Sequence, residues 1–149
     1  MATEMSQEAV STLNDLIETL KDGKNGFETA ASDVKDANVK AIFTQFAQQR
    51  SQLASELQSE VRKLGGDPEK SGSVSATMHR GWINIKSALG GGEKSILNEA
   101  ERGEDVAVRS YEKALQQNLP GDLSSVVRRQ YDQVKQAHDR VRDLRDSWK

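Results

Sequence analysis

Residues 65–92, GGDPEKSGSVSATMHRGWINIKSALGGG, interrupt an otherwise helical sequence and decide how its helices are connected. Gly, Ser and Pro residues at both ends of this stretch are typical of the segments between helices. The apolar residues around Trp82 predict one short helix within it, at about residues 76–89. A connection of this length can carry the chain from one end of a bundle to the other, because a helix of about 27 residues is about 40 Å long.

Two long helices are predicted before this connection, at about residues 6–34 and 38–64, and two after it, at about 93–118 and 122–147. In each of them apolar residues recur at alternating steps of three and four, which places them on one face of a helix. The predicted inward-facing residues are Val10, Leu13, Ile17, Leu20, Phe27, Ala31 and Val34; Val39, Phe43, Phe46, Leu53, Leu57 and Leu64; Leu97, Ala100, Ala107, Tyr111 and Ala114; and Val127, Tyr131, Val134, Val141 and Trp148.

The ends of these helices indicate how they pair. Ser6 and Asp122 are suitable N-cap residues for the first and last helix. The connections around Asp36 and Pro120 are short, so each pair of helices forms an antiparallel hairpin. Two hairpins joined by one long crossover is the connectivity of ferritin-like bundles. We therefore predict one all-α domain over residues 1–149, a ferritin-like up-and-down four-helix bundle with one long crossover that contains a short extra helix.

The composition excludes several classes of function. The chain has no cysteine, which rules out a disulfide framework, a thiolate zinc site and a cysteine nucleophile. Its 21 basic and 23 acidic residues are interleaved, so we expect no nucleic-acid partner. No apolar run is long enough to cross a bilayer, and the N-terminal residues do not resemble a signal peptide. We therefore expect no membrane partner and a cytoplasmic location.

One strongly polar residue interrupts each apolar face, namely Lys24, Arg50, Glu104 and His138. Each lies near the middle of its helix, so the four could meet in one buried polar layer of an antiparallel bundle. In one interpretation Arg50 and Glu104 form a buried ion pair beside His138, and loss of one partner would cost about 3 to 5 kcal/mol. In the other, the long polar side chains extend to the rim of the bundle, which we favour for Lys24, and His138 is an ordinary, partly buried histidine that donates to a backbone group or a carboxylate.

The same residues bear on metal binding. A di-iron carboxylate bundle needs a Glu from each of two helices and a Glu-x-x-His motif from each of the other two. This chain has no Glu-x-x-His motif, and two cationic side chains lie on the predicted inner faces, so we expect a degenerate di-iron site without a cofactor. The alternative is a weaker iron site formed by Glu104 and His138, with Glu101 as a further ligand. No catalytic residue is predicted, and we expect the protein not to be an enzyme.

Short motifs occur over nearly the whole chain. They are Asp22-Gly23, Gly26-Phe27, Arg50, Glu56-Leu57, Leu64-Gly65-Gly66-Asp67-Pro68, Ser71-Gly72-Ser73, His79-Arg80-Gly81-Trp82, Arg102-Gly103-Glu104-Asp105 and Tyr111. Together they resemble a bacterial family of ferritin-like four-helix-bundle proteins, the domain-of-unknown-function family 2383, whose members have no assigned activity.

This resemblance implies a ferritin-like fold, and it places Glu104 and His138 at the third-helix and fourth-helix positions of metal ligands. The remaining ligand positions depart from that pattern, since they are occupied by Phe27, Arg50, Leu53 and Lys135. The resemblance therefore supports the fold and argues against di-metal chemistry.

Three functions remain as hypotheses. The first is a non-enzymatic bundle, stress-associated or a scaffold, that acts through its surface or as a homodimer. The second is an iron-binding protein. The third is an interaction module whose crossover presents Trp82 to a protein partner of unknown identity. The alternative is that Trp82 and Ile85 pack over the open end of the bundle, which we favour because aromatic residues at helical spacing usually pack inward.

Overall fold

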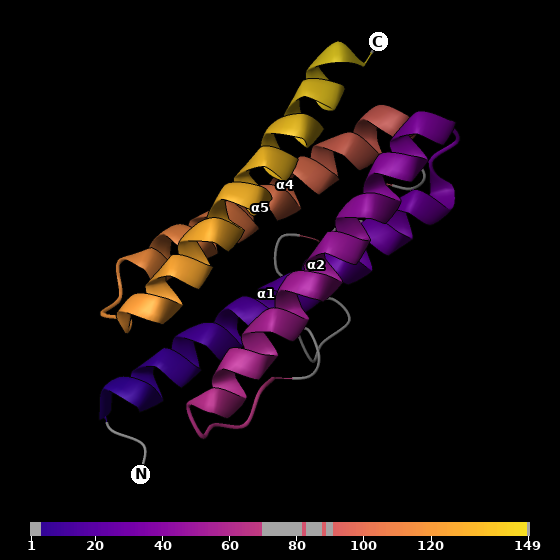
Figure 1. Cartoon of the computed structure of the whole chain (residues 1–149). Helices are drawn as coiled ribbons and strands as arrows, with labels where there is room; N and C mark the ends of the chain where they lie inside the picture. Colours follow the sequence, from indigo (N-terminus) through magenta and orange to yellow (C-terminus); the bar gives the residue numbers. More distant parts are fainter. Residues whose placement is uncertain (1–3, 70–81, 83–87, 89–90, 149) are drawn as a thin grey trace.

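The computed structural model describes residues 4–69, Trp82, Ala88 and residues 91–148. Over these residues it has four long helices, which confirms the predicted all-α four-helix bundle (Figure 1). They are α1 (Glu4–Asp33), α2 (Ala37–Lys63), α4 (Glu93–Leu115) and α5 (Gly121–Ser147). The short helix predicted at 76–89 falls outside the described residues, apart from Trp82 and Ala88.

Two of the predicted N-cap residues, Ser6 and Asp122, are wrong. Helix α1 begins at Glu4, so Ser6 lies inside its first turn and is not the N-cap. Helix α5 begins at Gly121 after Pro120, and Asp122 lies in its first turn, where a negative charge is favourable at the positive end of the helix dipole. The N-cap of α2 is Asp36, whose carboxylate accepts hydrogen bonds from the backbone N–H groups of the next turn.

The end of α2 shows why the sequence stops the helix there. Gly65 has a φ of +82°, a left-handed conformation that glycine adopts without steric cost. The N–H groups of Gly65 and Gly66 donate to the carbonyl oxygens of Arg62 and Val61, at 3.0 Å each. These two bonds form the Schellman arrangement, which satisfies the last carbonyl groups of a helix. Helix α4 ends at Leu115, earlier than the predicted residue 118, and its N-cap is Gly92.

Contacts at both ends of the crossover establish its direction. After α2, the side-chain amide of Asn14 donates to the carbonyl of Asp67 and accepts from the N–H of Glu69, at 3.0 and 2.8 Å. At the start of α4, the Glu93 carboxylate accepts from the N–H of Lys35 at 2.7 Å. The crossover therefore starts beside the first half of α1 and ends near Lys35, just after the last residue of α1. Helix α4 consequently runs parallel to α2 (Figure 1).

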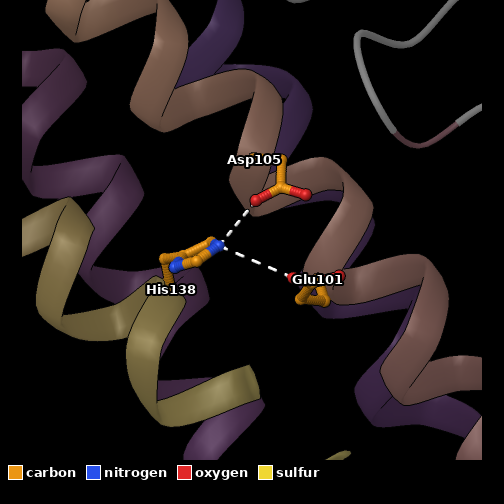
Figure 2. A group of neighbouring side chains, drawn as sticks. All are labelled: Glu101, Asp105 and His138. Atoms are coloured by element: carbon orange, nitrogen blue, oxygen red, sulfur yellow. Dashed lines mark hydrogen bonds and ion pairs between the residues drawn. The ribbon is translucent and has the colours of Figure 1, made fainter.

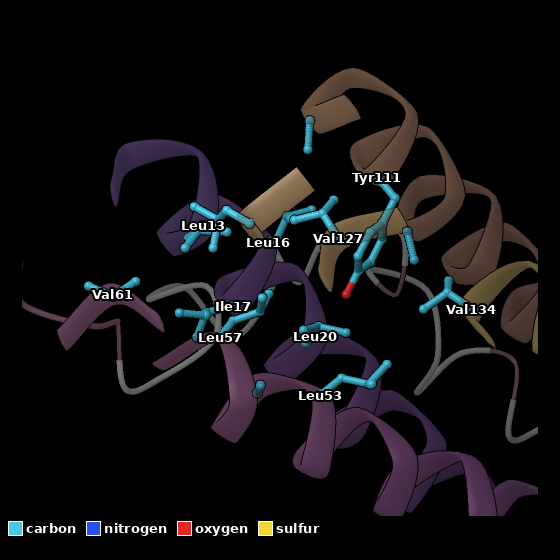
Figure 3. Close-up of a cluster of buried hydrophobic side chains, with 14 of the residues drawn as sticks. Leu13, Leu16, Ile17, Leu20, Leu53, Leu57, Val61, Tyr111, Val127 and Val134 are labelled. Atoms are coloured by element: carbon cyan, nitrogen blue, oxygen red, sulfur yellow. The ribbon is translucent and has the colours of Figure 1, made fainter. Parts of the chain in front are cut away.

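The core consists of two clusters, one toward each end of the bundle. In the first, Leu13, Ile17 and Leu20 of α1 pack with Leu53 and Leu57 of α2, and Tyr111, Val127 and Val134 join them from α4 and α5 (Figure 3). The second includes Phe27, Val34, Val39, Phe43, Trp82, Ile96, Leu97 and Val141. Most predicted inward-facing residues are buried. The exceptions, which are only partly buried, are Val10, Phe46, Leu64, Tyr131 and Trp148.

None of the described helices combines the length and apolar character that a membrane span requires.

Candidate functional site

The four polar residues of the predicted inner layer occupy three different environments. Arg50 and Glu104 are buried and contact each other. Lys24 is partly exposed and pairs with Glu28 one turn along α1, at 3.2 Å. His138 contacts carboxylates on the flank of α4. The structure thus shows the ion pair, brings Lys24 to the surface, and does not assemble all four residues into one layer.

The Arg50–Glu104 pair is bidentate and fully enclosed. Nη1 and Nη2 of Arg50 donate to the two carboxylate oxygens of Glu104 at 2.5 and 2.6 Å, and the side chains are 1% and 0% exposed. The Nε–H of Arg50 donates to Gln49, and the guanidinium carbon lies 5.4 Å from the centre of the Phe27 ring. Such parallel charge-assisted bonds are strong, and they offset the cost of removing both charges from water.

Trp82 packs between two helices next to this pair. Its side chain is 2% exposed, and its ring meets the Phe27 ring edge-on, with centroids 4.9 Å apart. A Cβ atom at Gly26 of α1 or at Gly103 of α4 would overlap the indole. These two glycines therefore form a slot for Trp82. This explains why glycine, which is unfavourable in helices, occurs in the interior of α1 and of α4. Inward packing of Trp82 is confirmed, although it contacts helix faces and does not cover the end of the bundle.

The interior does not fit a di-iron centre. Both oxygens of Glu104 accept hydrogen bonds from the guanidinium of Arg50, whose fixed positive charge occupies the space a cation would need. Two further ligand positions are apolar and buried, at Phe27 and Leu53, and Lys135 is exposed. The donor set of a di-iron carboxylate bundle is therefore missing from these positions.

A second charged group lies between α4 and α5 and contains the predicted residue His138 (Figure 2). Its Nε2 atom is 2.6 Å from Oδ1 of Asp105 and 3.7 Å from Oε1 of Glu101, two residues that lie one turn apart on α4. Nδ1 of the same ring is 3.0 Å from Oδ1 of Asp139. This group is more open than the first, because the side chains of His138, Glu101 and Asp105 are 14%, 15% and 44% exposed.

The surrounding charges act on the protonation of His138. Burial lowers its pKa, but hydrogen bonds and negative charges from Asp139 and Asp105 outweigh this effect and raise the pKa above the usual 6.5. The hydrogen bond with His138 in turn lowers the pKa of Asp139. Arg145 of α5 donates to Oε2 of Glu101 at 2.8 Å and partly balances the negative charge of the group.

This geometry changes the set of residues that can hold a metal ion. Oxygen and nitrogen atoms of Glu101, Asp105 and His138 all lie within 4.8 Å of one another, whereas Glu104 is not part of this group. The sequence pointed to His138 and Glu101 but missed Asp105. The available signal was the four-residue spacing of Glu101 and Asp105, which puts both carboxylates on one face of α4.

A polar network that the sequence did not suggest joins three helices in the first core cluster. The buried Tyr111 hydroxyl donates to Oε1 of Gln130 at 2.7 Å, and Nε2 of Gln130 donates to Oε1 of Glu56 at 2.7 Å and to the carbonyl of Leu53 at 3.3 Å. Burial raises the pKa of Tyr111, so its hydroxyl remains a hydrogen-bond donor. This network orients α5 on α2 and α4, and it presents no reactive group.

Together these features define an all-α four-helix bundle with an ion-paired interior and a charged group at one helix interface. Comparison with protein families shows that the chain belongs to the family described as "Domain of unknown function (DUF2383)", which matches residues 8–117. The match covers most of α1 and all of α2, continues through α4, and ends before α5. No curated protein matches the chain at a significant level.

Proposed function

We propose that this protein is a non-enzymatic, ferritin-like bundle whose interior has an ion pair where metal-binding bundles have ligands. The bidentate contact of Arg50 with Glu104 carries this proposal. Any cation entering the interior would have to displace the guanidinium and leave it buried without a partner, which is strongly unfavourable. The crossover connectivity supports the ferritin-like affiliation, since bundles of that kind have two hairpins and one long crossover.

The role that we propose is structural. The protein would act as a scaffold or stress-associated protein, in the cytoplasm, through its surface or as a homodimer. The filled interior supports this role, because it leaves the surface as the part of the bundle that can contact other molecules. Sedimentation velocity over a range of concentrations tests the dimer, and a monomer at every concentration would contradict it.

The two other hypotheses have less support from the geometry. An iron site made by Glu104 and His138 would need both side chains to turn toward one point, but Glu104 faces Arg50 and His138 faces Asp105. An interaction module anchored by Trp82 would need an exposed indole, and this one is buried in its slot.

Anaerobic titration with Fe²⁺, followed by exposure to oxygen, tests the main proposal. We expect ferric iron to form no faster than in protein-free buffer, and a di-iron bundle protein assayed in parallel serves as the positive control. Two tightly bound Fe²⁺ ions per chain, or iron oxidation that disappears in Glu104→Ala, would contradict the proposal.

A further inference from the structure

The carboxylates around His138 are arranged so that a proton on the ring cannot form hydrogen bonds with both of them. Two carboxylates from α4 converge on one ring nitrogen, Nε2, at 2.6 Å from Asp105 and 3.7 Å from Glu101 (Figure 2). A hydrogen on Nε2 can form a hydrogen bond with the Asp105 oxygen, but the Glu101 oxygen, at 3.7 Å, is beyond hydrogen-bond distance. Within the described parts of the chain, no hydrogen bond reaches Oε1 of Glu101, while its Oε2 accepts from Arg145.

The other side of the imidazole ring is already oriented. Nδ1 of His138 is 3.0 Å from the Asp139 carboxylate. In the tautomer that donates Nδ1–H to Asp139, the Nε2 lone pair points toward Asp105 and Glu101. Histidines that bind metals almost always donate their second ring N–H to a carboxylate, a carbonyl or water in this way. Asp139 thus supplies an outer partner that is independent of the two carboxylates facing Nε2.

We propose that Glu101, Asp105 and His138 form a binding site for one divalent transition-metal cation such as Zn²⁺. Their donor atoms lie within 4.8 Å of one another. One imidazole nitrogen and two carboxylate oxygens give three protein ligands, the number found in zinc sites that keep one position open for water. The 44% exposure of Asp105 gives the ion a route from solvent. This inference goes beyond the proposed function, because the site is separate from the Arg50–Glu104 pair.

Arg145 limits the strength of the site. Its guanidinium holds the second oxygen of Glu101, and its positive charge opposes the arrival of a cation. The bound state needs Asp105 to move slightly away from Nε2, since ligands of a tetrahedral Zn²⁺ lie about 3.4 Å apart when each is about 2.1 Å from the ion. Removing Arg145 should therefore increase the affinity, whereas removing any of the three ligands should reduce it.

The test is calorimetric titration of the full, chelator-treated chain with Zn²⁺ in a buffer that contains excess Mg²⁺ to occupy nonspecific carboxylate sites. We expect one Zn²⁺ per chain. Affinity should fall at least about tenfold in His138→Ala and in Asp105→Asn, and rise in Arg145→Gln. Titration with Co²⁺ should give visible absorption bands in the wild type that are lost in His138→Ala.

Two matched variants serve as controls. His79→Ala removes the only other histidine of the chain, and Glu112→Gln removes an α4 carboxylate outside the site; both should bind Zn²⁺ like the wild type. Circular dichroism shows whether each variant folds, and Asp105→Asn keeps the test decisive if the more buried His138 variant does not fold. Failure of the wild type to bind Zn²⁺, or equal binding by wild type and Asp105→Asn, would overturn the proposal. Neither result depends on Glu104, so it would leave the proposed function standing.

Discussion

The two charged groups of this bundle arise from the same sequence pattern and occupy opposite environments. Arg50 and Glu104 are essentially inaccessible, at 1% and 0% exposure, and every charge-bearing atom has a partner. His138 lies beside carboxylates that reach solvent, with Asp105 44% exposed. A polar residue on the apolar face of a helix can thus lie in either environment, and the facing helix determines which one it has.

The difference follows from what surrounds each group. Phe27 lies over the guanidinium of Arg50, and Trp82 packs against Phe27, so aromatic rings separate the pair from water. His138 meets the flank of α4, where Asp105 and Glu101 are close enough to interact and Asp105 is open to solvent. The buried pair should therefore matter most for stability, and the open group should respond most to pH and to ions.

The largest expected effect is that of breaking the buried pair. Glu104→Gln keeps the shape of the side chain but leaves the Arg50 guanidinium buried without a counter-charge, and should lower the free energy of unfolding by about 3–5 kcal/mol. Urea denaturation followed by circular dichroism measures it. Lys24→Ala, which removes an exposed pair with Glu28, is the control and should change the value by no more than about 0.5 kcal/mol.

A double variant separates the charge effect from lost packing. Arg50→Met combined with Glu104→Leu removes both charges, and should be close to the wild type in stability or above it. If Glu104→Gln lowered the free energy of unfolding no more than Lys24→Ala does, the buried pair would not matter more for stability than the exposed one.

The next largest effect concerns the slot that holds Trp82. Gly103→Ala or Gly26→Ala places a methyl group where the indole lies, and overpacking of this kind costs about 1–3 kcal/mol. Gly23→Ala is the matched control, because its Cβ would lie at an ordinary 3.4 Å from Nη1 of Arg50. This control should be neutral or more stable by up to about 1 kcal/mol, the helix propensity gained by Ala over Gly.

Thermal unfolding compares these glycine variants, and fluorescence in a Trp148→Phe background reports on Trp82 directly. Emission should shift to longer wavelength in Gly103→Ala, since the displaced indole meets water. If the Gly103→Ala protein were as stable as the Gly23→Ala protein and its emission were unchanged, the glycine at position 103 would not be required for the packing of Trp82.

The smallest effect is the pH dependence of the open group in metal-free protein. Asp105 and Glu101 face His138 from α4, Asp139 contacts it from α5, and Arg145 of α5 holds the second oxygen of Glu101. Because the pKa of His138 is higher in the folded than in the unfolded chain, its stabilising contribution is complete below the unfolded value of 6.5 and is lost as pH rises through the folded pKa.

The stability difference between wild type and His138→Gln should accordingly be larger at about pH 5.5 than at about pH 8. Urea unfolding of both proteins in the presence of a chelator measures it. A difference that is equal at the two pH values, or larger at the higher one, would show that the surrounding carboxylates do not hold the protonated form.

Much of the fold was predictable because its signals are local. The steps of three and four among apolar residues marked four helices, and the Gly-rich and Pro-rich ends of residues 65–92 marked the crossover. Helix starts were less predictable, since a Ser or Asp near a helix start can be an N-cap or belong to the first turn. Ser6 and Asp122 both lie in first turns.

The charged groups were predictable only in part. Helical phase predicted that Arg50 and Glu104 lie on inner faces, and they form the ion pair of one of the two interpretations. Lys24 has the same phase, but it extends to Glu28 because its side chain is long and flexible. Asp105 lies one position beyond the inner face, and periodicity does not tell which flank of α4 meets α5. The contact of Trp82 with Gly103 likewise has no periodic signal, since it depends on how the crossover packs.

The placement of Trp82 also bears on how the bundle unfolds. Its indole fills a slot whose two walls belong to different hairpins, Gly26 of α1 and Gly103 of α4. If the two hairpins separate, the indole loses one wall of its slot, and the rings of Phe27, Phe43 and Phe46 in the α1–α2 hairpin are exposed to water. A single crossover residue thus couples the two halves of the chain, so that they should open in one cooperative step and forms with only one hairpin intact should be rare.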